Sequence, residues 1–466
     1  MQNNNRRRNN RTNNMYYTYK IYQNNLGNGN KINNNNKKKN NNNNNNNINI
    51  KTNKPIENKG YSNNNNLITY QPLAQAYKVQ KSSNNRSQIN KQLHNKLAIE
   101  KKRKYNNGKI GLLNIGNTCY INSAIQNLKN VYPLTLYFLS HYLDFDENLF
   151  ARKYCELIAN LINQDFRQYI EPREFVLKLC DVAPIFRFGQ QNDSSFCIIY
   201  ILNLLEKEDK VLKSSKLLQN IKNFNFDLNT EESNKFKLFL NKFNEKRNSF
   251  IIDYFYGFQK DIYQCNNKLC KKKNYTFQGI SVLNLSIMTQ NNNPIYTLEE
   301  AIKHYQYGQN HINEEGFYCP DCKNKKITTK SVLIYLPKIL IINFRRIGEK
   351  DFYQHNVEIP EILEMNKIID KMDYKYELTG FIKHIGGANS GHNIAICKNF
   401  FDNNWYEYND SMVRPLNNNK YGNNYYSTEN KIDTSDGFIF FYKKEEDIIT
   451  ENEKNEIIEK SSEIRK

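Results

Sequence analysis

The sequence lacks any long apolar run. Its most apolar stretch, Val332 to Phe344, is interrupted by Pro337 and Lys338 and is too short to span a bilayer. The arginines near the N-terminus are not followed by the apolar segment of a signal peptide. We therefore expect no membrane span, no membrane partner and no secretory signal.

Cysteine is also scarce. The 466 residues include nine cysteines, most of them isolated, which is not the dense pattern of a disulfide-stabilised secreted domain. This usage favours a reducing, intracellular location in the cytoplasm or the nucleus.

Acidic residues are almost absent from the first 105 positions. This segment holds 21 Lys and Arg residues but only Glu57 and Glu100 as acids, so its net charge of +19 accounts for nearly all of the chain's formal +20. Apolar residues are too sparse there to offset the entropy of ordering. We expect residues 1–105 to form a disordered basic arm. It could hold nucleic acid or an acidic surface weakly, or be only a solvated tail.

The first ordered pattern follows a single cysteine. Apolar residues recur at helical spacing from Ile121 to Leu128, which predicts a helix after Cys119, capped by Asn117 or Thr118 and ended by Pro133. A thiol in the first turn of a helix meets free N–H groups and the helix dipole, which favour the nucleophilic thiolate. A buried structural cysteine fits the same pattern, because free cysteine is often buried.

The pattern then predicts further helices at Tyr154–Ile162 and Phe175–Leu179, and a capped helix where the polar Gln190–Cys197 block meets apolar Ile198–Leu205. Residues 206–249 show little periodicity and could be an insertion. Alternation of aromatic and β-branched residues predicts strands in the rest of the chain. The expected strands are Phe250–Tyr263, Tyr275–Ile287, a buried strand at Val332–Arg346, two within Tyr376–Cys397 on either side of a glycine-rich loop, and Gly437–Tyr442. From Lys443 we expect a charged tail that frays.

Two cysteine pairs, Cys265-x4-Cys270 and Cys319-x2-Cys322, occur in the strand-rich region. On hairpin tips they can supply four thiolates to a structural Zn²⁺, which would hold together a β extension with little core of its own. Free thiols in a reduced protein are the alternative, and His304 or His311 could replace a ligand.

Several of these segments resemble the ubiquitin-specific protease family, or ubiquitin carboxyl-terminal hydrolases, and occur in that family's order. They are the Gly-Asn-Thr-Cys-Tyr motif at Cys119, the Gln-Gln-Asn-Asp block, the cysteine pairs, Leu336-Pro337 with the following strand and Arg345-Arg346, Gly391-His392, and Trp405–Asp410. The resemblance covers about residues 110–443.

The resemblance implies an α+β fold: a papain-like cysteine protease core, with a helical thumb, a β palm and a zinc-bearing β fingers extension. It places the catalytic domain at 108–445, the fingers at about 250–335 and a charged tail at 446–466. It also implies activity as a deubiquitinating thiol isopeptidase, with ubiquitin and ubiquitinated proteins as partners. A catalytically weak ubiquitin-binding module, or a protease for a ubiquitin-like modifier, is the alternative.

By position in the motifs, the resemblance implies that Cys119 is the nucleophile and His392 its general base. It implies that Asn409 orients the histidine, with Asp410 able to take or share that role. Asn114 corresponds to the side chain that stabilises the oxyanion. These roles fit thiol chemistry, in which a thiolate attacks a carbonyl and fixed donors meet the developing charge.

Substrate-binding positions implied in the same way are Gln191, Asp193 and Gly391. Two residues depart from the family. Asn393 stands where Tyr is usual after Gly-His, and Phe196 stands where an acid is usual in the Gln-Gln-Asp block. Because Asp193 is then the only remaining acid of the two, we expect weaker binding of the arginine-bearing ubiquitin tail or a shifted preference among modifiers.

Overall fold

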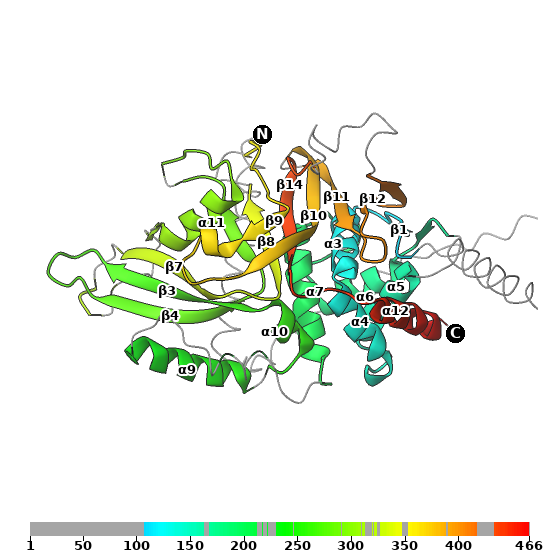
Figure 1. Cartoon of the computed structure of the whole chain (residues 1–466), viewed down its shortest axis with the longest axis horizontal. Coiled ribbons are helices and arrows are strands. Elements are labelled where there is room, and N and C mark those ends of the chain that lie inside the picture. Colours follow the sequence, from blue (N-terminus) through cyan, green and yellow to red (C-terminus); the bar gives the residue numbers. More distant parts are fainter. Residues whose placement is uncertain are drawn as a thin grey trace, which may run out of the picture. The chain divides into compact units, whose positions relative to one another are not determined.

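The computed structural model describes residues 107–162, 167–211, 217, 221, 230–245, 247–289, 291–308, 310–312, 319, 321–323, 327–346, 353–387, 390–416 and 433–465. The predicted basic arm, residues 1–105, lies outside these ranges. The described residues form a group of helices and two larger sheets (Figure 1), with a small parallel pair, β1 (Gly111–Leu112) and β2 (Tyr169–Ile170), beside them. Among these helices, none combines the length and the apolar character needed to cross a bilayer.

Helix α3 (Cys119–Asn130) lies between the helices and the large sheet, and every one of its residues is buried. It contacts α7 (Ser194–Glu208) as well as strands β10 (Lys375–Gly387) and β11 (Ser390–Lys398). A helix packed on all sides holds its first residue in a fixed place. The other helices near it are α4 (Tyr132–Ser140), α5 (Phe150–Ile162), α6 (Arg173–Val182) and α10 (Phe250–Phe255), with a 3-10 turn at Tyr142–Asp144.

The end of α3 differs from our prediction. The helix stops at Asn130, and Pro133 lies in the first turn of α4. Proline is favoured at a helix start because its missing N–H would have no partner there. Pro133 therefore begins the next helix instead of ending this one.

The large sheet has the strand order β13-β12-β11-β10-β14-β8-β5, with β9 paired to one end of β10. All neighbours are antiparallel except β5 and β8. The remaining strands are β5 (Leu283–Ser286), β8 (Ile339–Arg345), β9 (Ile362–Glu364), β12 (Trp405–Asn409), β13 (Met412–Pro415) and β14 (Gly437–Lys444). This order places β11 and β12 side by side, so that residues at their ends can meet.

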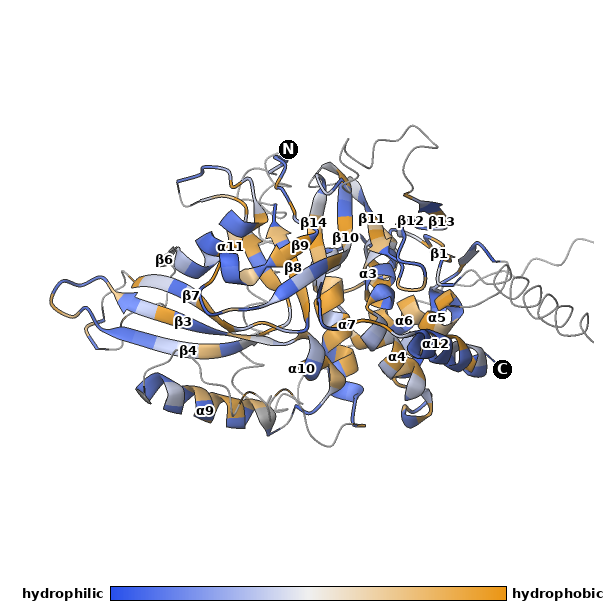
Figure 2. Cartoon of the chain, in the orientation of Figure 1, coloured by the Kyte–Doolittle hydropathy of each residue, from blue (hydrophilic) through white to orange (hydrophobic). Residues whose placement is uncertain are grey.

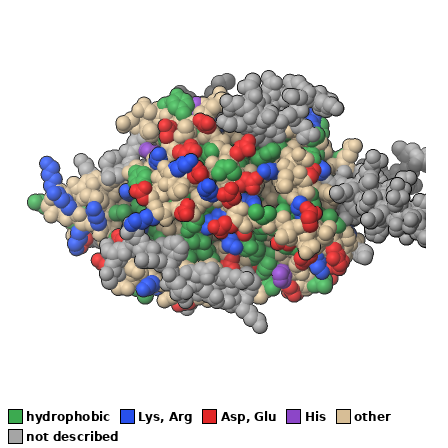
Figure 3. Space-filling model, in the orientation of Figure 1, with side chains coloured by type: hydrophobic (Ala, Val, Ile, Leu, Met, Phe, Trp, Pro, Cys, Tyr) green, Lys and Arg blue, Asp and Glu red, His purple; other side chains and the backbone are tan. Residues whose placement is uncertain are grey.

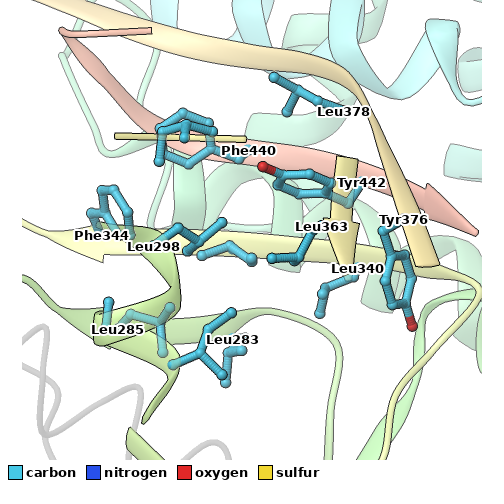
Figure 4. Close-up of a cluster of buried hydrophobic side chains, with 14 of the residues drawn as sticks. Leu283, Leu285, Leu298, Leu340, Phe344, Leu363, Tyr376, Leu378, Phe440 and Tyr442 are labelled. Atoms are coloured by element: carbon cyan, nitrogen blue, oxygen red, sulfur yellow. The ribbon is translucent and has the colours of Figure 1, made fainter. Parts of the chain in front are cut away.

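The main hydrophobic core packs on this sheet. Figure 4 shows Leu340 and Phe344 of β8, Phe440 of β14 and Leu378 of β10 gathered over leucines from β5 and from α11 (Leu298–Tyr307), with buried Tyr376 and Tyr442 among them. The two tyrosine hydroxyls donate to the carbonyl oxygens of Pro337 and Pro360, both at 2.6 Å. A 3-10 turn at Met365–Lys367 adds Met365 to the core.

The smaller sheet has the order β4-β3-β7-β6, with strands β3 (Gly257–Cys265), β4 (Lys273–Ile280), β6 (Asn310–Ile312) and β7 (Ile327–Tyr335). Its strands are more hydrophilic than those of the large sheet, as Figure 2 shows for β3, β4 and β7. On one face, α9 (Thr230–Asn244) supplies Phe236, Phe239 and Phe243, whose rings meet the Phe258 and Phe277 rings. This aromatic cluster includes Phe258, near the start of β3. Cys265 ends β3, and the other three cysteines lie in the connections that follow β3 and β6.

Two of the predicted strands proved wrong in part. Phe250–Phe255 is the helix α10, and the strand begins only at Gly257. The Ser249 hydroxyl accepts the Ile252 N–H at 3.2 Å and Asp209 accepts the Phe250 N–H at 2.7 Å. These caps satisfy the free N–H groups of a helix start. The predicted strand Tyr275–Ile287 is likewise divided, between β4 in the small sheet and β5 in the large one.

The predicted buried strand at Val332–Arg346 is also two strands. Leu336 and Pro337 separate β7, in the small sheet, from β8, in the large sheet. Proline cannot donate to a strand ladder, so it is found where a strand ends. The β8 half is buried at every residue except the last, as predicted.

The charged C-terminal tail does not fray as we expected. Residues Glu451–Ile464 form helix α12, which contacts α4 and α5. The Thr450 hydroxyl accepts the Glu453 N–H, and the Glu453 carboxylate accepts the Thr450 N–H. This capping box fixes the start of the helix, and Ile457 is fully buried beneath it.

Candidate active site

A sharp turn leads into α3. Gly116 has φ of +118° and Asn117 has φ of +53°, both in the left-handed region. The Thr118 carbonyl accepts the N–H groups of Ile121 and Asn122 at 3.0 and 2.9 Å. Thr118 occupies the N-cap position, but its side chain makes no cap bond, in contrast to our prediction. Its hydroxyl instead accepts the Ile115 N–H at 3.1 Å, which tightens the turn.

Cys119 is the first residue of α3 and is only 4% exposed. Burial raises the pKa of its thiol above the ordinary value, and the Asp410 carboxylate acts in the same direction. The main-chain N–H groups of Asn393, Tyr120 and Cys119 itself lower the pKa. The N–H groups at the helix start thus lower the pKa of the thiol, as predicted. The loss of hydration raises this pKa by more than they lower it, so the thiol is not the low-pKa group we expected.

His392 lies near the start of β11, one residue before Asn393. Its Nε2 is 2.8 Å from Oδ1 of Asn409, the last residue of the adjacent strand β12. An amide oxygen can only accept, so the imidazole carries its proton on Nε2 and leaves Nδ1 as a base. The antiparallel pairing of β11 and β12 creates this contact. The sequence prediction that these two residues meet agrees with the structure.

Asp410 lies next to Asn409, in a turn with φ of +50°. Its Oδ2 accepts Nδ2 of Asn114 at 2.9 Å, and its Oδ1 accepts Nδ2 of Asn122 at 2.8 Å. Oδ2 is 3.7 Å from Nε2 of His392. The Asp410 carboxylate therefore accepts hydrogen bonds from two asparagines. His392 lies closer to Asn409, at 2.8 Å, than to Asp410, at 3.7 Å.

Asn114 is held at both ends of its side chain. Besides donating to Asp410, it accepts the N–H groups of Gly116 and Thr118 at 3.2 and 3.1 Å through Oδ1. The amide is thus fixed over the turn that leads to Cys119. Asn122, one turn along α3, completes this network. The sequence analysis did not identify Asn122, because its polar amide was its only signal.

The Gln190–Cys197 block forms the start of α7, as predicted. Asp193 is its N-cap and accepts the Ser195 N–H at 2.6 Å. Gln191 donates to the carbonyl oxygen of Gly391 at 3.2 Å, directly before His392. The structure therefore brings Gln191 and Gly391 to the site. Phe196 follows in the first turn of α7 and is half-buried.

The four predicted cysteine ligands come together at the end of the small sheet. The sulfur atoms of Cys265 and Cys322 are 3.5 Å apart, those of Cys270 and Cys319 are 3.8 Å apart, and all four lie within 4.8 Å of one another. Tetrahedral Zn²⁺ with bonds of about 2.3 Å requires sulfur separations of about 3.8 Å. The cluster therefore fits a metal ion of this kind.

This cysteine cluster lies among exposed lysines. Lys268 and residues 271–273 are exposed, and blue side chains gather at this tip in Figure 3. His304, the alternative ligand in α11, is not in the cluster, which within the described ranges consists of the cysteines alone. The His311 side chain lies outside those that the structure describes.

The arrangement defines a class of protein. The buried helix that begins at a cysteine packs against two adjacent strands, one of which carries a histidine and the other an asparagine, and this is the architecture of a papain-like cysteine protease. Comparison with solved structures agrees. The SAGA DUB module of Ubp8, Sgf11, Sus1 and Sgf73 bound to monoubiquitin matches with a TM-score of 0.52 at 17% identity, over 74% of this chain and 70% of that one. At this identity the likeness shows the fold alone.

The family follows from the sequence comparison. A family model described as ubiquitin carboxyl-terminal hydrolase matches residues 110–442, so the chain belongs to that family. Ubiquitin carboxyl-terminal hydrolase Usp2 of Drosophila melanogaster is 25% identical over 350 residues, which is 72% of this chain and 35% of that protein. Ubiquitin carboxyl-terminal hydrolase 4 of Saccharomyces cerevisiae strain YJM789 is 24% identical over 386 residues, which is 72% of this chain and 39% of the relative. The chain thus spans little more than a third of the length of these relatives.

Proposed function

We propose that this chain is a deubiquitinating thiol isopeptidase, which hydrolyses the bond between the C-terminal glycine of ubiquitin and a substrate lysine. The names of its relatives and the family match support this substrate. The observation that carries the proposal is the meeting of α3 with β11. Cys119 begins α3, which packs against β11, and Asn409 accepts a hydrogen bond from His392 of that strand at 2.8 Å.

In the proposed reaction, Nδ1 of His392 takes the proton of Cys119, and the sulfur attacks the glycine carbonyl carbon. The imidazolium then protonates the lysine amine as the C–N bond breaks, which leaves a thioester on Cys119. His392 next removes a proton from water, the hydroxide attacks the thioester, and the thiol leaves with that proton. Asn409 keeps the ring oriented through both steps by accepting from Nε2.

Asn114 is the proposed oxyanion donor. Its NH₂ group has two hydrogens, and only one of them is used by Asp410, at 2.9 Å. The other can meet the oxygen that becomes negative during attack. Asp410 thus serves as a positioning residue for Asn114, which gives it a role distinct from that of Asn409.

The proposed path for the ubiquitin tail runs between α7 and the loop before His392. Gln191 and Gly391 face each other there, at 3.2 Å. Gln191 can donate to the extended tail after releasing the Gly391 carbonyl oxygen, which then becomes free to accept an N–H group of the tail. Asp193 caps α7 through Oδ1, which leaves Oδ2 of its carboxylate to face the path of the tail.

The test is a ubiquitin probe with a C-terminal electrophile. We expect one adduct, located on Cys119 by peptide mass spectrometry, and no adduct on Cys119→Ser. Cys155→Ser is the matched control, because Cys155 is fully buried in α5 and should not affect labelling. Labelling that persists in Cys119→Ser, or none in the native protein, would refute the proposal. A panel of probes built on ubiquitin-like modifiers then establishes which modifier is accepted.

We also propose that the four-cysteine cluster binds one structural Zn²⁺. The sulfur separations and the soft donor set support this ion, and the small sheet has few apolar residues at that end to hold it together. Metal analysis should find one zinc per chain, lost in Cys270→Ser and retained in the control Cys180→Ser, which changes a half-buried cysteine outside the cluster. Full zinc content in Cys270→Ser would contradict the assignment.

A further inference from the structure

A second histidine lies beside the proposed active site. His384 of β10 is directly opposite Asn393 of β11 in the antiparallel pair, so the two side chains share one face of the sheet. Nδ1 of His384 is 2.8 Å from Oδ1 of Asn393. The proposed mechanism does not use His384.

The hydrogen bonds continue from Asn393 to α3. Nδ2 of Asn393 donates to the Ser194 hydroxyl at 3.0 Å, and this hydroxyl is 3.4 Å from that of Ser123. The Ser123 hydroxyl donates to the carbonyl oxygen of Tyr120 at 3.2 Å. Because each hydroxyl has one hydrogen and that of Ser123 points to Tyr120, Asn393 donates to Ser194 and Ser194 donates to Ser123. The chain of bonds therefore joins β10 to the first turn of α3.

His384 also lies against Gly391, the residue before His392. A Cβ atom added to Gly391 would lie 2.3 Å from Nε2 of His384, so the ring fits only because residue 391 is glycine. The Phe438 ring, nearly perpendicular to the imidazole and 6.2 Å away between ring centroids, bounds it on another side. His384 thus touches the residue before His392 and hydrogen-bonds the residue after it.

We propose that His384 is a positioning residue for the active site: it holds Gly391 and Asn393 on either side of His392 and, through Ser194 and Ser123, fixes them against the first turn of α3. The proposal rests on the thiol chemistry assigned to Cys119 above. It gives a defined role to Asn393, one of the two residues that depart from the family pattern.

The positioning by His384 aims the main-chain N–H of Asn393 at the Cys119 sulfur. The main-chain N–H of Asn393 lowers the pKa of the Cys119 thiol, against the larger effect of burial. When the side-chain bonds that hold Asn393 are removed, this donor becomes less well aligned. A hydrogen bond to a charged group is stronger than one between neutral groups. Partial loss should reduce the thiolate fraction of Cys119 at pH 7 by about threefold to tenfold.

The experiment compares His384→Phe with His384→Asn. Phenylalanine keeps a ring beside Gly391 but removes the donor, whereas the asparagine amide keeps a donor near the position of Nδ1. The rate of iodoacetamide alkylation of Cys119 is measured against pH by mass spectrometry of its peptide. We expect the profile of His384→Phe to move to higher pH, with a threefold to tenfold lower rate at pH 7, and His384→Asn to remain within about twofold of the native rate.

With a fluorogenic ubiquitin amide, kcat should fall in His384→Phe while KM is unchanged. Ser194→Ala, a milder change, should shift the alkylation profile in the same direction. Thr379→Val is the control, because it removes a bond to the Phe441 carbonyl oxygen near the far end of β10. Native profiles for both His384→Phe and Ser194→Ala, or equal defects in the Phe and Asn variants, would overturn the proposal.

Alkylation requires no ubiquitin, so the two proposals fail separately. If the native chain does not cleave ubiquitin but the Phe and Asn variants differ in alkylation as expected, the substrate assignment is wrong and the positioning role stands. If ubiquitin is cleaved but alkylation is the same in all variants, the positioning role is wrong.

Discussion

At the scale of single residues, asparagine amides connect the parts of the site. Asn409 accepts from His392, Asn114 and Asn122 donate to Asp410, and Asn393 accepts from one strand and donates to a helix. An amide offers both a donor and an acceptor, so it can link an acceptor group to a donor group, which a carboxylate, an acceptor only, cannot do. The site is therefore held by directional bonds more than by ion pairs.

Asn114→Ala should reduce kcat for a fluorogenic ubiquitin amide by about 10²- to 10³-fold with a smaller change in KM, because the donor acts on charge present only in the transition state. Asp410→Ala should reduce kcat in the same direction by releasing Asn114. Asn404→Ala, in the loop before β12, is the control. A kcat for Asn114→Ala within twofold of the native value would show that another donor meets the oxyanion.

Phe196→Glu should lower KM for ubiquitin substrates, because a second carboxylate would join Asp193 near the path of the basic ubiquitin tail. The position is in the first turn of α7, where an acid also suits the helix dipole, so folding should be unaffected. Phe196→Gln, similar in size but uncharged, should leave KM close to native. Steady-state kinetics of both variants make the comparison, and an unchanged KM in Phe196→Glu would refute it.

The sequence predicted the residues of the site whose signal is local. Cys119 and His392 lie in short motifs, and Asn409 follows at a fixed distance along the next strand. The partners Asn122, His384 and Ser194 were not predicted, because their bonds depend on the register of β10 with β11 and on how α3 packs on α7. No periodicity in one segment carries that information.

At the scale of elements, local capping and proline chemistry decided the boundaries that hydrophobic patterns missed. Phe250–Phe255 alternates well enough for a strand, yet Ser249 and Asp209 cap it as a helix. Pro337 divides one apolar run between two sheets. Helix α12 is mainly polar, and it follows from the Thr450 capping box and from the burial of Ile457.

Ile457→Ala should lower the free energy of unfolding by about 2–4 kcal/mol, because this fully buried side chain anchors α12 against α4 and α5. Glu459→Ala, at an exposed position of the same helix, should change it by less than about 0.5 kcal/mol. Urea titration followed by circular dichroism measures both. Equal stability of the two variants would mean that α12 contributes little to the folded domain.

At the scale of the whole domain, a buried lysine joins Gly108, near the start of the described residues, to the central helix α3. Lys129 of α3 is completely buried, donates to the carbonyl oxygen of Gly108 at 2.5 Å and to Gln126 at 2.8 Å, and lies 4.3 Å from the centre of the Tyr408 ring. The Tyr408 hydroxyl also donates to Gly108. These contacts fix the first described residues to the core.

Burial lowers the pKa of Lys129 from 10.5 to about 7. Between these values the unfolded chain binds a proton that the native chain does not, so stability should rise with pH from about 7 to 10.5, by at most ~1.4 kcal/mol per unit. Below pH 7 both states are protonated and this dependence ends. Lys129→Met should remove the rise, and the difference between native and variant unfolding free energies across pH isolates it. Parallel curves would show that Lys129 stays charged in the fold.

The burial of Cys119 has a consequence for survival under oxidative stress. Peroxide attacks the sulfur anion, so a sulfur that is 4% exposed and whose pKa is raised by burial is oxidised slowly. Burial would therefore protect Cys119 from irreversible oxidation to the sulfonic acid between catalytic cycles.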